Sequence, residues 1–196
     1  MKTNSIILIS VVAVIVIAFF WGMSSYNGLV TKQEDVISQW SNVENQYQRR
    51  SDLIPNLVST VKGYATHESS TLEGVVAARA RATQVTIDPK NLTPEKLQEY
   101  QAAQGQVSSA LGKLLMITEN YPDLKANQNF LELQAQLEGT ENRISTERGR
   151  FNEIAKDYNA SIRLFPRNII AGMFGFEKKP YFEAEKGSEK APEVKF

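Results

Sequence analysis

Three charged residues occupy positions where a seven-residue repeat otherwise places apolar side chains: Arg50, Glu68 and Glu147. A charge on the core face of a helix is costly unless it is paired and hydrogen-bonded. Glu141 and Asn142 precede Glu147 on the same predicted helix and can join such a group. We therefore predict a structural polar network of these five residues, which fixes the register in which the helices align.

Carboxylates in such positions are also the groups that bind metals or handle protons inside helical bundles. Glu68 and Glu147 could therefore form a metal or proton-handling site instead. A third interpretation is that the charges lie at the solvated edge of the core. His67 is the only histidine, and no second histidine follows it four residues later, as a zinc-protease helix requires. Because no nucleophile, base and orienting residue can be assigned, we predict no catalytic residue, no metal and no cofactor.

The composition excludes several classes of protein. The 196 residues include 22 Lys and Arg and 22 Asp and Glu, so the formal net charge is zero. A nucleic-acid-binding protein needs a basic face to neutralise phosphates, so we predict no nucleic-acid partner. The chain contains no cysteine, which excludes disulfides, thiol chemistry and cysteine-ligated zinc.

Residues 5–21 read SIILISVVAVIVIAFFW and contain no charge. As a helix this run is about 26 Å long, close to the roughly 30 Å of a bilayer's hydrocarbon core. Trp21 and Tyr26 stand where interfacial aromatic residues are expected. We predict a single-pass transmembrane anchor over residues 1–23, with residues 5–23 in contact with lipid. A cleaved signal peptide is the alternative, but its apolar region is usually only about 7–15 residues long.

The charges that flank this run indicate an orientation. Lys2 and the α-amine precede it, whereas the first basic residue after it, Lys32, is closely followed by Glu34 and Asp35. Positive charge is enriched on the cytoplasmic side of membrane proteins. We therefore predict a cytoplasmic N-terminus in the inner (cytoplasmic) membrane and an extracytoplasmic body.

An apolar heptad pattern follows the anchor and keeps its phase from Leu29 to Val85, which predicts one long helix with a packed face. Pro55 lies inside this pattern, and we interpret it as a kink in a continuous helix. A helix start at Ser51 or Asp52 is the alternative, because proline is tolerated in a first turn. The two rows of the pattern are Gln33, Trp40, Tyr47, Ile54, Val61, Glu68, Val75 and Ala82, and Leu29, Val36, Val43, Arg50, Leu57, Tyr64, Thr71, Ala78 and Val85.

Two further helices are predicted. Thr93 as N-cap and Pro94 at the first position begin a helix that ends near Asn120. The last long helix begins near Leu124, ends before Pro166, and carries a core row: Phe130, Leu137, Ile144, Phe151, Tyr158 and Phe165. No strand pattern is present. The predicted fold is all-α, an antiparallel up-and-down bundle of about four helices, spectrin- or bromodomain-like, with an N-terminal transmembrane helix.

The predicted organisation is an anchor (1–23), a bundle (24–165), an aromatic C-terminal arm (166–184) and a disordered tail (185–196). The arm lacks periodicity, and we expect it to be irregular and packed on the bundle. Its aromatic residues are the candidates for binding a partner: Phe174, Phe176, Tyr181 and Phe182.

Several long stretches resemble the LemA family of bacterial membrane-anchored helical proteins. They are SSYNGLV, WSNVENQYQRRSDLIPNLVSTVKGYATHE, AARARA, YPDLKANQNFLELQAQLEGTENRIS, and FNEIAKDYNASIRLFP with GFEKKPYFE. Two departures are visible. Met23 stands where many relatives have a lipidated cysteine, so we expect the helix itself to be the anchor. Phe151 stands where tyrosine is common.

The resemblance implies a bundle of about four helices and a role in the cell envelope, with no catalytic residues to transfer. One branch of the family belongs to magnetosome formation, and other members accompany membrane metalloproteases. We therefore expect a non-enzymatic scaffold or interaction module, with self-association or a protein partner. An accessory subunit of a membrane metalloprotease is the alternative, and a metal or small-ligand site in the bundle is a third.

Overall fold

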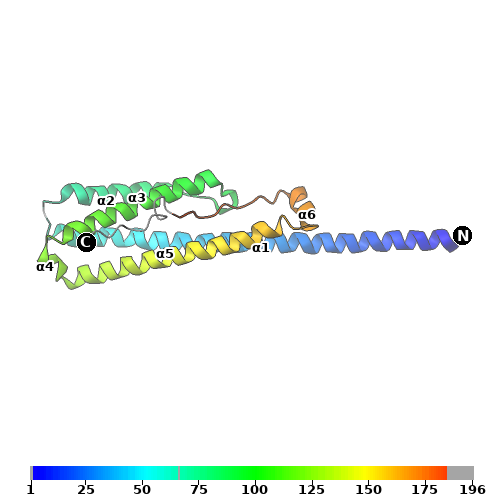
Figure 1. Ribbon diagram of the computed structural model, residues 1–196, viewed down its shortest axis with the longest axis horizontal. Coiled ribbons are helices and arrows are strands. Elements are labelled where there is room, and N and C mark those ends of the chain that lie inside the picture. Colours follow the sequence, from blue (N-terminus) through cyan, green and yellow to red (C-terminus); the bar gives the residue numbers. More distant parts are fainter. Residues whose placement is uncertain (1, 66, 185–196) are drawn as a thin grey trace, which may run out of the picture.

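The computed structural model describes residues 2–65 and 67–184, and their side chains from residue 5 onward. All regular secondary structure in this part of the chain is helical, which confirms the predicted all-α bundle with an apolar N-terminal helix (Figure 1). The elements are α1 (Lys2–Lys62), α2 (Ser69–Gln84), the 3₁₀ helix η1 (Pro89–Asn91), α3 (Pro94–Thr118), α4 (Pro122–Lys125), α5 (Gln128–Ser161) and α6 (Arg167–Phe174).

Helix α1 is 61 residues long and joins the apolar run to the bundle without a break. Its first part projects beyond the other helices and is exposed on all sides, and from Ser25 onward it has a buried face (Figure 1). It is the one described helix long and apolar enough to cross a membrane. Pro55 lies inside it, as predicted.

The predicted continuous helix from Leu29 to Val85 is wrong, because α1 ends at Lys62 and the chain reverses before α2. Val61 and Val75, both buried, lie fourteen residues apart, which is two heptads. The turn therefore has a length that preserves the apolar phase, and the pattern alone does not reveal it. The pattern does weaken there, since Tyr64 on the predicted core row is 42% exposed.

Local capping explains where α3 and α5 begin. The Thr93 hydroxyl accepts a hydrogen bond from the Lys96 amide at 3.3 Å, as predicted, and the Asn127 side chain accepts one from the Phe130 amide at 3.0 Å. Helix α5 ends at Ser161, and a cis peptide bond precedes Pro166. Phe165 was predicted in the core but is 81% exposed, because the helix that would place it there has already ended.

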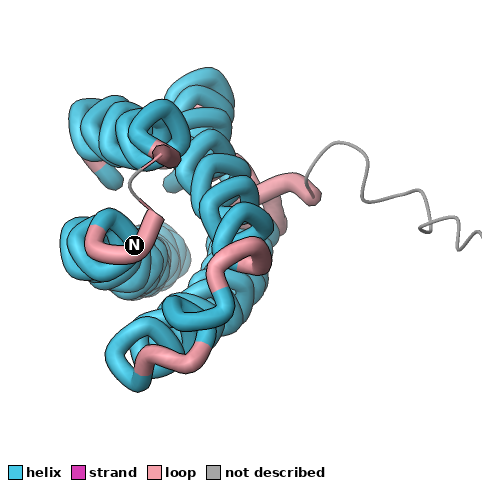
Figure 2. Tube along the Cα trace, turned by 90° about the vertical axis from the view of Figure 1, so that its left-hand side faces the viewer, coloured by secondary structure: helices cyan, strands magenta, loops and turns pink. Residues whose placement is uncertain are grey.

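The long helices lie roughly along one axis, with α5 beside α1 and α2 beside α3 (Figure 2). Their buried side chains form two clusters. The proximal cluster, nearer the apolar run, contains Leu29, Val36, Trp40, Val43, Tyr47, Ile87, Leu92, Leu97, Tyr100, Ile144, Phe151, Ala155, Tyr158, Ile162, Ala171 and Phe182. The distal cluster contains Ile54, Leu57, Val61, Ala65, Leu72, Val75, Ala78, Ala82, Ala103, Val107, Leu111, Leu114, Leu124, Phe130 and Leu137.

The segment predicted as an irregular arm has two parts. Its first part forms helix α6, which ends at Phe174 and is followed by Gly175 with φ 72°, the left-handed conformation that glycine adopts after helix ends. Residues 175–184, called the arm from here on, then run back along the bundle without regular structure (Figure 1). The predicted tail, residues 185–196, lies outside the described residues.

Candidate functional site

The guanidinium of Arg50 lies inside the bundle between the two clusters, and the side chain is only 2% exposed. Its Nη1 donates to Glu141 Oε1 at 2.7 Å and to Ser108 Oγ at 2.8 Å. Its Nη2 donates to Gln104 Oε1 at 2.7 Å and to the Gln104 carbonyl at 3.1 Å. One side chain of α1 therefore binds α3 and α5 at once.

The two partners of the ion pair differ in burial: the Arg50 side chain is buried, whereas the Glu141 side chain is 41% exposed. The neutral acceptors on Ser108 and Gln104 surround the buried end of Arg50. A buried guanidinium without such acceptors would be strongly destabilising, whereas a fully hydrogen-bonded one is tolerated and specifies its geometry. A helix that slid along its neighbour would separate these groups, so the site fixes the alignment of three helices.

Two tyrosines complete the surroundings of Arg50. Its Cζ lies 5.1 Å from the ring centroid of Tyr47, a cation–π contact. The rings of Tyr47 and Tyr100 meet edge to face, with centroids 5.4 Å apart. Burial, reinforced by the nearby Tyr47 and Glu44, raises the pKa of Tyr100 far above its ordinary value. The Tyr100 hydroxyl therefore keeps its proton to a higher pH than an exposed tyrosine does.

A small cavity of about 130 Å³ borders Arg50 between α1, α2 and α3. Glu44, Arg79 and Tyr100 are among its lining residues, and Arg79 Nε donates to the Ser51 carbonyl at 2.8 Å. No histidine or cysteine lines it. Within residues 2–65 and 67–184, no group of three or more His, Cys, Asp or Glu side chains is placed to hold a metal ion.

The structure brings Arg50 and Glu141 together and places the other predicted network residues elsewhere. Glu147 accepts from Gln39 Nε2 at 2.7 Å and from Arg150 Nη1 at 3.0 Å. Asn142 is exposed, next to Glu141 but on the outside of α5.

Glu68 precedes α2 at the far end of the bundle, where it accepts from the Tyr121 hydroxyl at 3.0 Å. This hydrogen bond raises the pKa of Tyr121. Glu147 contacts Gln39, and α1 continues for 23 residues beyond Gln39 before it ends at Lys62, about 35 Å along the helix. The alternative of a metal site shared by Glu68 and Glu147 is therefore wrong, because a metal ion requires ligands about 2 Å away.

The four aromatic candidates for partner binding differ in exposure. Phe182 is buried: its ring stacks on Trp40 with centroids 5.8 Å apart and meets Phe151 at 5.3 Å. It belongs to the core and cannot bind a partner, because the arm carries it back into the bundle. Phe176 and Tyr181 are half-buried, and Phe174 alone is exposed.

Two asparagines of α5, which sequence reasoning missed, hold the arm in place. Asn152 Nδ2 donates to the Phe182 carbonyl at 2.9 Å, and its Oδ1 accepts from the Phe182 amide at 2.8 Å. Asn159 makes the same pair of bonds with Lys179, both at 2.8 Å. The seven-residue spacing of the two amides puts them on one helix face, which is the signal that could have revealed them.

Lys179 is the second buried cation of the bundle. Its Nζ donates to the Lys90 carbonyl at 2.7 Å, which ties the arm to η1. Burial lowers the pKa of Lys179, although Glu177 and Asp88 oppose the shift. Like Arg50, this side chain joins separate segments and faces no described group that it could activate.

Comparisons with known proteins find several relatives of this chain. The chain is 30% identical over 175 residues to magnetosome protein MamQ 2 of Paramagnetospirillum magneticum, which covers 81% of this chain and 64% of that protein. MamQ of Magnetospirillum gryphiswaldense is 29% identical over 174 residues, 80% of this chain and 64% of that protein. The chain thus spans less than two thirds of the length of these relatives.

A shorter relative and a family model cover the same bundle. Protein LemA of Metamycoplasma hominis is 24% identical over 168 residues, 86% of this chain and 73% of that protein. The model of the LemA family matches residues 39–196, which include most of α1 within the bundle and all later helices. The chain belongs to the LemA family of membrane-associated helical proteins.

Proposed function

We propose that the chain is a non-enzymatic, single-pass scaffold of the bacterial cell envelope, whose helical rod presents a surface to a protein partner. The observation that carries this proposal is the continuity of α1 from the apolar run into the bundle core. Lys62 lies 41 residues after Trp21, which corresponds to about 60 Å of helix. A rod of this kind holds its far end at a set distance from the bilayer.

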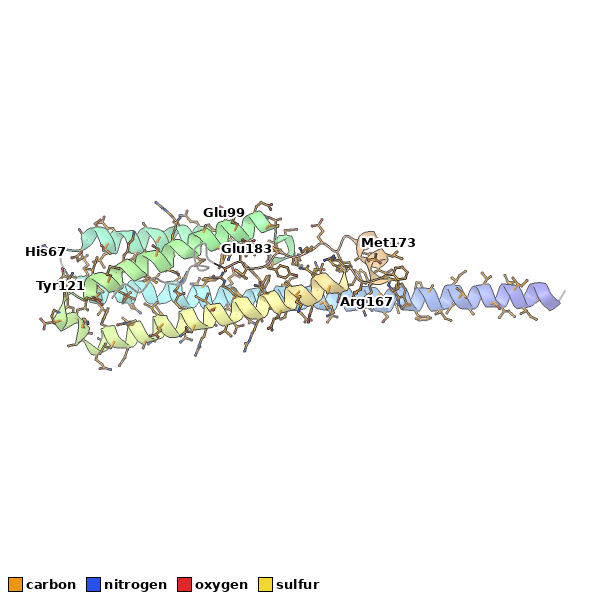
Figure 3. The ribbon with its side chains drawn as sticks, in the orientation of Figure 1. His67, Glu99, Tyr121, Arg167, Met173 and Glu183 are labelled. Atoms are coloured by element: carbon orange, nitrogen blue, oxygen red, sulfur yellow. The ribbon has the colours of Figure 1, made fainter. Side chains whose placement is uncertain are left out.

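The buried polar groups support a structural role. Arg50, Asn152, Asn159 and Lys179 each bind another helix or the arm. His67, the only histidine of the sequence, is exposed in the turn between α1 and α2 (Figure 3). The charges that flank the apolar run favour an extracytoplasmic body in the inner membrane, so we place the partner outside the cytoplasm.

Photo-crosslinking in intact cells tests the proposal. A photoreactive amino acid at Met116, which is exposed toward the far end of α3, should capture a defined protein or a second copy of the chain. The matched variant carries a flexible Gly-Ser segment between Trp21 and Gly22, which leaves the bundle anchored but no longer rigidly coupled. We expect the crosslink to be lost in this variant.

The outcomes separate the candidate functions. No crosslink at any exposed position of the bundle would contradict a scaffold, and an unchanged crosslink in the flexible variant would contradict a rigid one. Capture of a membrane metalloprotease would identify the chain as its accessory subunit, and deletion of the chain should then change the cleavage of that protease's substrates.

A further inference from the structure

Exposed apolar side chains outside the apolar run of α1 gather in one place. Leu164, Phe165, Ile169, Met173 and Phe174 are all exposed within eleven residues of the chain. Elsewhere in the described part of the bundle, large exposed apolar residues stand singly on different elements. Single exposed residues need no explanation, but a contiguous apolar patch marks an interaction surface.

This patch lies where α1 leaves the bundle. A Cβ atom added at Gly22 would be 3.8 Å from Ile170 Cδ1, and the ring centroids of Tyr26 and Phe174 are 4.7 Å apart. Ala171 of α6 is buried. One face of α6 therefore packs on α1 directly after the apolar run, and the other face is free (Figures 1 and 3).

The charges within this segment are of one sign, and the first acidic residue after it is Glu177. Arg163 and Arg167 flank Phe165, and residues 161–176 contain no Asp or Glu. Arg163 is exposed and Arg167 is half-buried. The chain as a whole has a net charge of zero, so this combination of arginines and apolar side chains is local. Such segments bind the surface of anionic bilayers, with the apolar face among the upper acyl chains and the cations at the headgroups.

We propose that residues 163–174, called the foot, lie in the bilayer interface and form a second membrane contact beside the transmembrane helix. The occupant is lipid because the foot packs on the very helix that enters the membrane, at the level of Tyr26, an interfacial aromatic residue. Two contacts fix the tilt and rotation of the rod, which a single span leaves free. The inference rests on the membrane anchoring of α1 and is independent of the proposed scaffold function.

Depth measurement with spin labels tests the foot, and the chain is suited to it because it contains no cysteine. Met173 on α6 and Met116 on α3 are 72% and 71% exposed, which makes them a matched pair (Figure 3 labels Met173). Each is changed to cysteine singly (Met173→Cys, Met116→Cys), labelled with a nitroxide, and studied in the full chain. Val14→Cys gives the reference for a label inside the bilayer.

The chain is reconstituted at one copy per nanodisc in a mixture of phosphatidylcholine and phosphatidylglycerol. The accessibility of each label to oxygen and to a water-soluble nickel chelate is then measured. The foot would lie about 5–10 Å into the headgroup and acyl boundary, so we expect nickel accessibility at position 173 to be on the order of tenfold lower than at position 116.

Equal nickel accessibility at positions 173 and 116 would overturn the proposal. The same measurement is repeated with several copies of the chain in one membrane. If the label at position 173 is protected from the nickel chelate only under that condition, the patch is an interface between copies and the proposal is overturned. A water-exposed label at position 14 would contradict the anchor itself, so failure of the foot and failure of the anchor are distinguishable.

Discussion

The proximal cluster contains Trp40, Tyr100, Phe151 and Phe182, whereas the distal cluster is built mainly from aliphatic side chains and alanines. In the distal half, four helices enclose the core and Ala78, Ala82 and Ala103 let α2 and α3 approach closely. In the proximal half, α2 has ended and α3 has only begun.

The arm supplies the missing wall of the proximal half. Large aromatic side chains fill the wider space there, and Phe182 closes it against Trp40. The bundle is therefore a four-helix structure for about half of its length. Nearer the apolar run it is a pair of helices, α1 and α5, completed by the segment around η1, the start of α3, α6 and the arm. The proximal half therefore depends on a segment without regular structure, and the distal half does not.

The strongest test of this difference is Phe182→Ala. It removes a buried ring from the proximal cluster, so we expect a loss of about 3–5 kcal/mol in the free energy of unfolding. Urea unfolding measures the loss, and hydrogen exchange should locate it around Trp40 rather than in α2. The control is Glu183→Ala, an exposed neighbour whose backbone bonds remain, with an expected effect within about 0.5 kcal/mol. An equal loss of protection in α2 would show that the halves are not independent.

Arg50→Met removes the side chain that joins the two halves. We expect the free energy of unfolding to fall by about 3 kcal/mol. This is at the lower end for a broken buried ion pair, because the partly exposed Glu141 side chain can be hydrated once Arg50 is gone. Arg49→Met is the matched control, since Arg49 is exposed and its loss should cost within about 0.5 kcal/mol. Thermal unfolding of both variants decides the matter. Equal midpoints would refute the structural importance of the Arg50 site.

The sequence predicted much of the fold because the heptad pattern records burial directly. Trp40, Ile54, Phe130 and Phe151 were placed in the core from that pattern, and they are buried. The turn after Lys62 was missed because its length keeps the apolar phase. Periodicity reports which face of a helix is buried, and it does not report where the chain reverses.

The polar contacts were harder to predict, for a physical reason. Arg50 was identified because it lies on the core row of the heptad pattern. Its partners Gln104 and Ser108 lie on α3, and their position along the bundle axis depends on the turns between α1 and α3. Asn152 and Asn159 hold a segment with no periodicity of its own. Contacts of this kind depend on the tertiary path of the chain, which no local pattern encodes.

A smaller effect is expected for the asparagines that hold the arm. Asn159→Ala leaves the Lys179 amide and carbonyl without their partners, so we expect a cost of about 1–3 kcal/mol. Asn142→Ala, on the exposed face of the same helix, should cost within about 0.5 kcal/mol. Urea unfolding with hydrogen exchange measures both. A cost for Asn159→Ala no larger than that of its control would mean that the two bonds of Asn159 do not help to hold the arm.

The smallest effect concerns alkaline pH. Burial, with Glu177 nearby, raises the pKa of Tyr158 to about 12, whereas an unfolded tyrosine titrates near pH 10. The folded state therefore retains the proton longer, and the stabilisation is complete below pH 10 and lost as pH rises toward 12. Tyr158→Phe should shift the alkaline unfolding midpoint to higher pH. An unchanged midpoint would show that Tyr158 does not contribute to alkaline unfolding.

One unbroken helix, α1, couples the apolar run to both halves of the bundle. Spin labels at Met23→Cys and Lys62→Cys, in the full chain in nanodiscs, test this by double electron–electron resonance. The two positions are 39 steps apart along α1, which predicts a single narrow distance near 58 Å, at about 1.5 Å per residue. A broad distribution, or one centred below about 45 Å, would require a break or hinge in α1 and would contradict the account.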